Sequence, residues 1–213
     1  MRKNILLYLS LVLFSLTSSA QEAKQILDEL SDKAANYKSM EADFSYRMLN
    51  DADGIDEMQK GSILTSGEKY NLEIAGQKII SDGKTVWTVI EDAEEVQISN
   101  VPEEDEAAEE YISPTKILTL WEKGFKYKYV GSENLNGAAH HLIDLFPEDP
   151  SDKSFHTIKL FINKAKMEVT KINIKGKDGT DYIYSIDEFN VNGNIAEGQF
   201  TFNKPNYDVI DLR

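Results

Sequence analysis

The sequence predicts an α+β fold: a large curved antiparallel β-sheet, an incomplete barrel of about 10–11 strands, with an N-terminal helix and one inserted helix. Three observations lead to this prediction. Most of the chain alternates apolar and polar residues with a period of two, as strands with one buried face do. Short turns separate these segments, which favours antiparallel neighbours. Helical periodicity occurs in only two places after the first twenty residues.

The first helical segment covers residues 22–37. Its apolar residues recur at the spacing of one helix face, and they are Ala23, Ile26, Leu27, Leu30 and Ala34. Charged residues occupy the opposite face. A single apolar stripe predicts that one side of this helix is buried against the sheet.

A hairpin in the middle of the strand region is the clearest local signal. Asp82-Gly83 tolerates the backbone angles of a tight turn, and apolar runs flank it on both sides. Alternation places Ile80, Trp87 and Val89 on one face of the hairpin, and Ile79, Val86 and Ile90 on the other. Apolar side chains on both faces predict a central ribbon that is covered on at least one side. Further along the chain, Phe200 and Phe202 are predicted to end the sheet.

The second helical segment follows residues 103–110, where six acidic residues predict a solvated loop, with docking of a basic partner as the other interpretation. Ser113 is the expected N-cap of the helix, and Gly124 follows its expected end. Its apolar stripe comprises Pro114, Ile117, Leu118 and Trp121. From the residues alone, ordinary core packing explains this stripe.

The first twenty residues have the order of a signal peptide. Arg2 and Lys3 precede an apolar run at residues 5–16, and small residues end at Ala20. We therefore expect residues 1–20 to be cleaved and residues 21–213 to form a single domain. The chain contains no cysteine, which excludes disulfides and a lipid-bearing cysteine after the signal, so a soluble exported protein is expected.

Charge and motif content narrow the function classes. The formal charge of −14 argues against nucleic acid and anionic membranes as partners. Without cysteine there is no thiol nucleophile or thiolate metal site. His140 and His141 are adjacent in a predicted strand, so they point to opposite faces and cannot share a metal ion. We find no nucleophile elbow and no phosphate-binding glycine loop, so no enzymatic activity, cofactor or metal is predicted.

Four segments in order resemble the LolA family, the periplasmic outer-membrane lipoprotein carriers. Residues 81–87 (SDGKTVW) are similar to the family's central hairpin, and residues 42–46 (ADFSY) to its first strand. Residues 113–115 (SPT) before an apolar helix are similar to its lid region, and residues 200–205 (FTFNKP) to its ending. The similarity covers roughly the whole mature chain.

The resemblance implies a periplasmic chaperone without enzymatic activity, expected to be a monomer. It would accept acylated lipoproteins from an inner-membrane ABC transporter and carry them to the outer membrane, to an acceptor where one exists. The implied acyl-chain cavity is lined by Phe44, Tyr46, Met48, Tyr70, Leu72, Ile74, Ile80, Trp87 and Val89. The implied lid comprises Pro114, Ile117, Leu118 and Trp121.

One departure from the family concerns the latch of this lid. The family's arginine is missing from residues 65–70, where Lys69 is the only cation. Lys69 is the candidate substitute, but its ammonium lacks the planar fork of a guanidinium, so the sequence leaves open how the lid is held closed. Two other functions fit the same residues: a carrier of another lipid or glycolipid, and a lipoprotein-sensing binding module.

Overall fold

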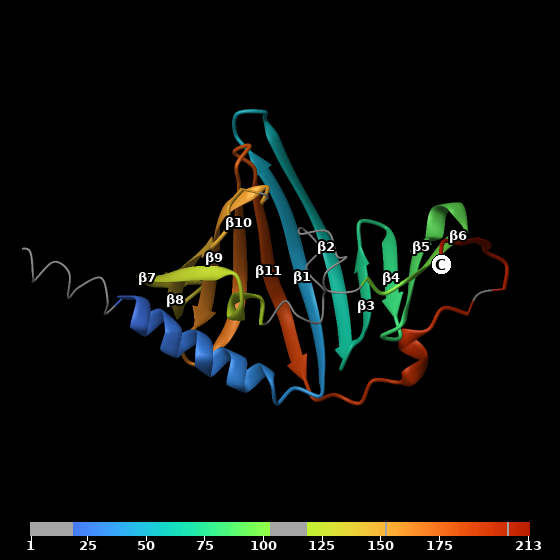
Figure 1. The fold of residues 1–213 in the computed structure, drawn as a ribbon, viewed down its shortest axis with the longest axis horizontal. Helices are drawn as coiled ribbons and strands as arrows, with labels where there is room; N and C mark the ends of the chain where they lie inside the picture. The colour runs from blue at the N-terminus through green and yellow to red at the C-terminus, as the bar shows by residue number, and fades with distance from the viewer. Residues whose placement is uncertain (1–18, 103–118, 152, 204) are drawn as a thin grey trace, which may run out of the picture.

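The computed structural model describes residues 19–102, 119–151, 153–203 and 205–213. In these residues one sheet of 12 strands runs in the spatial order β12-β6-β5-β4-β3-β2-β1-β11-β10-β9-β8-β7. Figure 1 shows the sheet strongly twisted and open, with β7 and β6 on opposite sides of the view. The prediction of a large, open, mainly antiparallel sheet with an N-terminal helix is confirmed.

The strands form two meanders that meet at one seam. The first meander is β1 (Ser39–Asn50), β2 (Ile55–Ser66), β3 (Lys69–Ile74), β4 (Gln77–Ser81), β5 (Thr85–Ile90) and β6 (Glu95–Asn100). The second is β7 (Phe125–Leu135), β8 (Ala138–Pro147), β9 (Phe155–Asn163), β10 (Glu168–Gly176) and β11 (Asp181–Val191). Antiparallel pairing of β1 with β11 joins them, with a bulge at Asp43/Phe44.

The N-terminal helix covers residues 19–34 of the described chain, so it ends three residues before the predicted end. Ala23, Ile26, Leu27 and Leu30 are buried, as the periodicity predicts. They form the largest core cluster with side chains of β8, β9 and β10. Figure 1 shows this helix, in blue, lying along the β7–β11 half of the sheet.

The hairpin between β4 and β5 forms where the sequence predicts it. The Asp82 Oδ1 atom accepts the backbone N–H groups of Lys84 at 2.9 Å and Thr85 at 2.8 Å, and Gly83 has a φ of 91°. Burial by itself would raise the pKa of Asp82, but the N–H groups of Thr85 and Lys84 lower it overall. The carboxylate therefore stabilises the turn in its charged form.

The chain after β11 differs from the prediction. Phe200 and Phe202 do not belong to a strand: Phe200 ends the short 3-10 helix η4 (Glu197–Phe200), and the last strand is β12 (Asp208–Asp211), parallel to β6. β11 lies inside the sheet, between β1 and β10, so the chain that follows it cannot pair there. It passes the first meander and adds β12 beside β6. Figure 1 shows this C-terminal segment passing the ends of β3 to β5. Its aromatic residues pack on the sheet instead of extending it.

The predicted inserted helix and the predicted signal peptide fall largely outside the described residues. The described part of the inserted segment is the 3-10 helix η3 (Leu120–Glu122), and Gly124 follows it with a φ of 78°. Ser19 and Ala20 lie in the N-terminal helix, where the Ser19 hydroxyl donates a hydrogen bond to the Tyr129 carbonyl oxygen at 2.8 Å.

Candidate ligand-binding face

The strand register assigns each side chain to one of two faces of the sheet, because directly paired residues point to the same side. We call the side covered by the N-terminal helix the inner face and the opposite side the outer face. In β8, β9 and β10 the inner face carries Ile143, Leu145, Ile158, Leu160 and Ile172, all buried in the cluster with the helix.

Beyond the helix the inner face continues with apolar and aromatic side chains, and polar residues such as Gln59 and Gln77 lie among them. Register links Ile172 to Tyr184 in β11, Tyr184 to Tyr46 in β1, and so across β2 to β5. The half-buried apolar and aromatic side chains of this part are Phe44, Tyr46, Met48, Leu72, Ile74, Ile79, Ile90, Tyr182, Tyr184 and Ile186. In the described chain, the core that the N-terminal helix builds contains no side chain from β1 to β6. We call this part the helix-free inner face.

The register separates the nine residues predicted to line one cavity. Phe44, Tyr46 and Met48 of β1 share the inner face with Tyr70, Leu72 and Ile74 of β3. Ile80, Trp87 and Val89 lie on the outer face, so they cannot line the same surface. There they pack with Val96 and with Phe202 and Tyr207 of the C-terminal segment.

The inner-face residues of that hairpin are Ile79, Val86 and Ile90, which the sequence placed together but did not assign to the ligand. Both faces of the hairpin are apolar, so alternation alone could not say which one the C-terminal segment would cover. Tyr70 is also nearly inaccessible, at 3% exposure, whereas the other five inner-face candidates are partly accessible. Their role as a cavity wall stays a prediction.

Three tyrosines stand at the boundary between the helix-covered core and the helix-free inner face. The ring centroids of Tyr46 and Tyr184 are 5.0 Å apart, and those of Tyr46 and Tyr182 are 6.4 Å apart. Burial, followed by the neighbouring Tyr46 and Tyr182, raises the pKa of Tyr184 to about 12. Burial also raises the pKa of Tyr46, with smaller effects from Tyr182 and Glu57. The phenols of Tyr46 and Tyr184 are therefore neutral near pH 7.

Of the four predicted lid residues, only Trp121 lies within the described chain. It is 3% exposed and belongs to the core cluster of the N-terminal helix. Its indole N–H donates a hydrogen bond to the Ser31 hydroxyl at 3.0 Å. Pro114, Ile117 and Leu118 fall outside the described residues, so the lid stays a prediction.

Lys69 lies in the segment where the family's arginine is missing, and its side chain forms an ion pair with the C-terminal segment. Its ammonium lies 2.5 Å from the Glu197 carboxylate of η4, on the surface. The Asn71 side-chain amide donates a hydrogen bond to the Gln199 carbonyl at 2.7 Å, next to this ion pair. Lys69 therefore helps to attach the C-terminal segment to β3.

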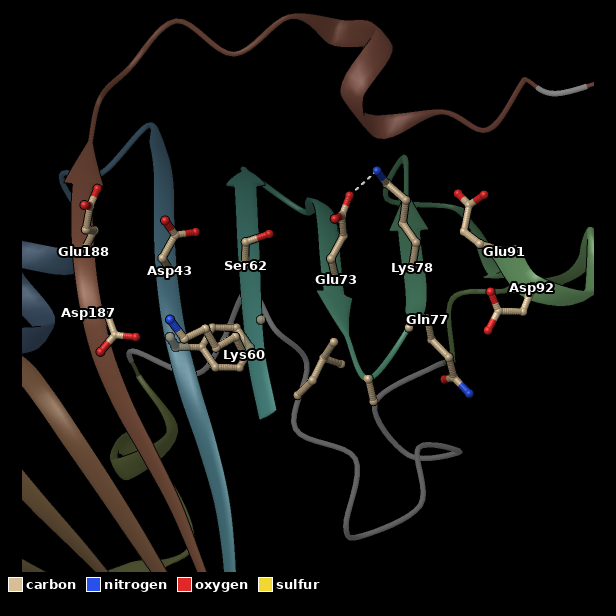
Figure 2. Close-up of a pocket in the computed structure, with 15 residues that line it drawn as sticks. Asp43, Lys60, Ser62, Glu73, Gln77, Lys78, Glu91, Asp92, Asp187 and Glu188 are labelled. Carbon is tan, nitrogen blue, oxygen red and sulfur yellow. Dashed lines mark hydrogen bonds and ion pairs between the residues drawn. The ribbon is translucent and has the colours of Figure 1, made fainter. Parts of the chain in front are cut away.

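A polar groove of about 720 Å³ lies on the outer face. Figure 2 shows Glu188, Asp43, Ser62, Glu73 and Lys78 in a row across five strands, and register makes them direct neighbours. Glu73 and Lys78 form an ion pair. Further acidic and basic side chains line the groove, namely Lys60, Glu91, Asp92 and Asp187. Phe44 and Ile74 also contribute to the lining of this groove. Its many charged side chains do not suit a hydrocarbon chain.

The histidines and acidic residues of the described chain do not gather into a metal site. No group of three or more His, Cys, Asp or Glu side chains there is arranged to hold a metal ion. His140 and His141 lie on opposite faces as predicted: His140 is buried and contacts the Ala138 carbonyl, while His141 faces Tyr129. No helix within the described ranges has the length and apolarity needed to span a membrane.

The comparisons with known proteins identify the family. No curated protein matches the chain. An uncharacterized conserved protein from Thermus thermophilus has a similar structure, with 14% identity, a TM-score of 0.58, and 89% of this chain and 99% of that chain covered. MucB, known from Pseudomonas aeruginosa in its complex with MucA, is similar with 13% identity and a TM-score of 0.52, with 89% of this chain and 66% of that chain covered.

At these identities the two structures show a shared fold alone. The family assignment comes from a family model, described as outer membrane lipoprotein carrier protein LolA, which matches residues 35–203. That match includes all of the strands except β12. The chain therefore belongs to the LolA family.

Proposed function

We propose that this protein is a periplasmic carrier that binds the acyl chains of lipoproteins on its helix-free inner face and takes them from the inner to the outer membrane. The observation that carries this proposal is the continuity of the inner face. The apolar surface buried by the N-terminal helix extends over β11 and β1 to β5, where Phe44, Leu72 and Ile74 remain partly accessible. Among them on the same face lie Glu57, Gln59, Gln77 and Thr88. Accessible apolar and aromatic side chains with a small number of polar groups are the usual lining of a lipid site.

The energetics fit a carrier that uses no covalent chemistry. Each methylene removed from water contributes roughly 0.8 kcal/mol of free energy. Complete burial of three chains of about sixteen carbons would therefore be favourable by on the order of 35 kcal/mol. An apolar sheet surface supplies this stabilisation without directional bonds, and an acceptor with a comparable surface can take the chains over. No catalytic step is needed in this function.

The proposed route begins with cleavage of residues 1–20 and release into the periplasm. An inner-membrane ABC transporter would supply the lipoprotein, and an outer-membrane acceptor, where one exists, would remove it. Pro114, Ile117, Leu118 and Trp121 would form a lid over the empty surface, with the protein acting as a monomer. Within the described residues, Lys69 pairs with Glu197 of η4.

A matched pair of isoleucine variants tests the proposed binding surface. Ile74 in β3 faces inward and Ile98 in β6 faces outward, and both are half-buried. We expect Ile74→Ser to weaken binding of a fluorescent triacylated peptide by about tenfold, because it removes apolar contact. Ile98→Ser should leave the affinity unchanged. Calorimetry should show a negative heat-capacity change on binding to the wild type.

Three outcomes would contradict the proposal or restrict it. Equal effects of the two variants would place the ligand elsewhere. A folded protein that binds neither the peptide nor a fatty-acid probe would contradict acyl-chain binding altogether. Co-purified lipid other than acylated protein, identified by mass spectrometry, would support a carrier of that lipid in place of a lipoprotein carrier.

A further inference from the structure

We propose that the hydroxyl groups of Tyr46, Tyr182 and Tyr184 bind the carbonyl groups through which acyl chains are joined to a neutral head group. This inference rests on the proposed function, because it concerns the same face of the sheet. It adds a substrate class: neutral acyl esters and amides are preferred over bare hydrocarbon chains and over fatty-acid anions.

The strand register brings these three residues together. Tyr46 in β1 pairs directly with Tyr184 in β11, and Met48 beside it pairs with Tyr182. The rings of Tyr46 and Tyr182 are stacked, and the Tyr46 and Tyr184 rings are tilted against each other. Tyr184 also packs against the helix-covered core. The cluster therefore lies at the boundary between the helix-covered core and the helix-free inner face, next to Gln59 and Glu57 of β2.

The hydroxyl groups of the cluster differ from those of Tyr129 and Tyr207. The Tyr129 hydroxyl contacts Ser132 and His141, and the Tyr207 hydroxyl donates to Glu91. Within the residues that the structure describes, the hydroxyls of the three clustered tyrosines make no hydrogen bond. Three phenol donors thus face the surface on which the acyl chains would lie.

The chemistry of an unpaired phenol favours a carbonyl-bearing ligand. A bound hydrocarbon would displace water from the hydroxyls and leave them without partners, which opposes binding. An ester or amide carbonyl accepts the phenol hydrogen and replaces the lost water. A tyrosine phenol keeps its proton near pH 7, so it is available as a donor.

The neighbouring strand argues against an anionic head group. Glu57 in β2 pairs directly with Met48 on the inner face, and its charge contributes to the raised pKa of Tyr46. A carboxylate or phosphate at the cluster would be repelled by Glu57. Acyl chains joined through neutral carbonyls, as in a diacylglyceryl group, avoid this repulsion.

Two matched ligands test the inference. The probes are 1,2-dioctanoylglycerol and its dioctyl ether analogue, which has the same chains and the same free hydroxyl but no carbonyl groups. We expect the wild type to bind the diester about tenfold more tightly than the diether, the effect of one good hydrogen bond. Replacing all three tyrosines by phenylalanine should abolish this preference and raise the affinity for the diether, because no phenol is then left without a partner.

The control is Tyr127→Phe, because Tyr127 also lies on the inner face but sits against the helix-covered core. It should retain the full preference. If the triple variant does not fold, Tyr182→Phe alone should reduce the preference. Equal wild-type affinity for diester and diether would overturn the inference while leaving the proposed function intact. Failure of the folded wild type to bind either probe would count against the proposed function itself.

Discussion

The ring of Phe44 in β1 lies over the backbone of Gly61 in β2. The two residues are direct cross-strand partners on the inner face. A Cβ atom at position 61 would approach within 2.5 Å of the Phe44 Cζ atom and within 2.7 Å of the Glu73 carbonyl oxygen. The missing side chain thus lets an aromatic ring cover β2 and form part of the floor of the proposed ligand surface.

Gly61→Ala should therefore destabilise the protein and displace Phe44. We expect a loss of about 1–3 kcal/mol in the free energy of unfolding, because both the ring and a backbone carbonyl must move. Urea unfolding measures this loss. The control is Gly198→Ala, where an added Cβ atom meets nothing within 4 Å. Identical unfolding midpoints for the two variants would contradict the packing of Phe44 over Gly61.

Trp121→Ala tests whether this tryptophan acts as a lid in addition to being buried. Its 3% exposure and its place in the helix core predict a loss of about 3–5 kcal/mol in stability. If Trp121 leaves its site when cargo binds, the variant should also bind acylated peptide more tightly, because the competing closed state is weakened. Unfolding midpoint and peptide affinity are measured together on wild type and variant.

The control for this experiment is Ser31→Ala, which removes the hydrogen-bond acceptor of the indole N–H but keeps the ring. We expect a smaller loss, about 1–3 kcal/mol. A large loss for Trp121→Ala with no gain in affinity would make Trp121 a core residue only, and the lid would then lack it.

Stability at alkaline pH should depend on Tyr184. Its pKa is raised to about 12 in the folded protein, so the stabilisation is fully present below pH 10 and is lost as the pH rises towards 12. The shift corresponds to roughly 2–3 kcal/mol across that interval. Tyr184→Phe should therefore lose less stability than the wild type between pH 10 and pH 12, as followed by urea unfolding. Parallel pH profiles for the two proteins would refute a raised pKa at Tyr184.

Much of the local structure was predictable from the sequence. The stripe from Ala23 to Leu30 identified the N-terminal helix, because helical periodicity directly reports one buried side. The strand alternation identified the sheet, and Asp82-Gly83 identified its central hairpin. These signals are local, since each depends on residues only a few positions apart.

The tertiary structure decided which face each strand presents to the helix. Ile79 and Ile80 are equally apolar and lie on opposite faces of the hairpin. The face of Ile80 is the one that the C-terminal segment covers, and that segment is more than a hundred residues away in the sequence. The pairing of β1 with β11 also brings Tyr46 next to Tyr184, across the seam where the two meanders meet. Alternation has two equivalent phases, so a strand's own residues cannot choose between faces that are both apolar. That choice depends on packing between distant segments, which no local pattern contains.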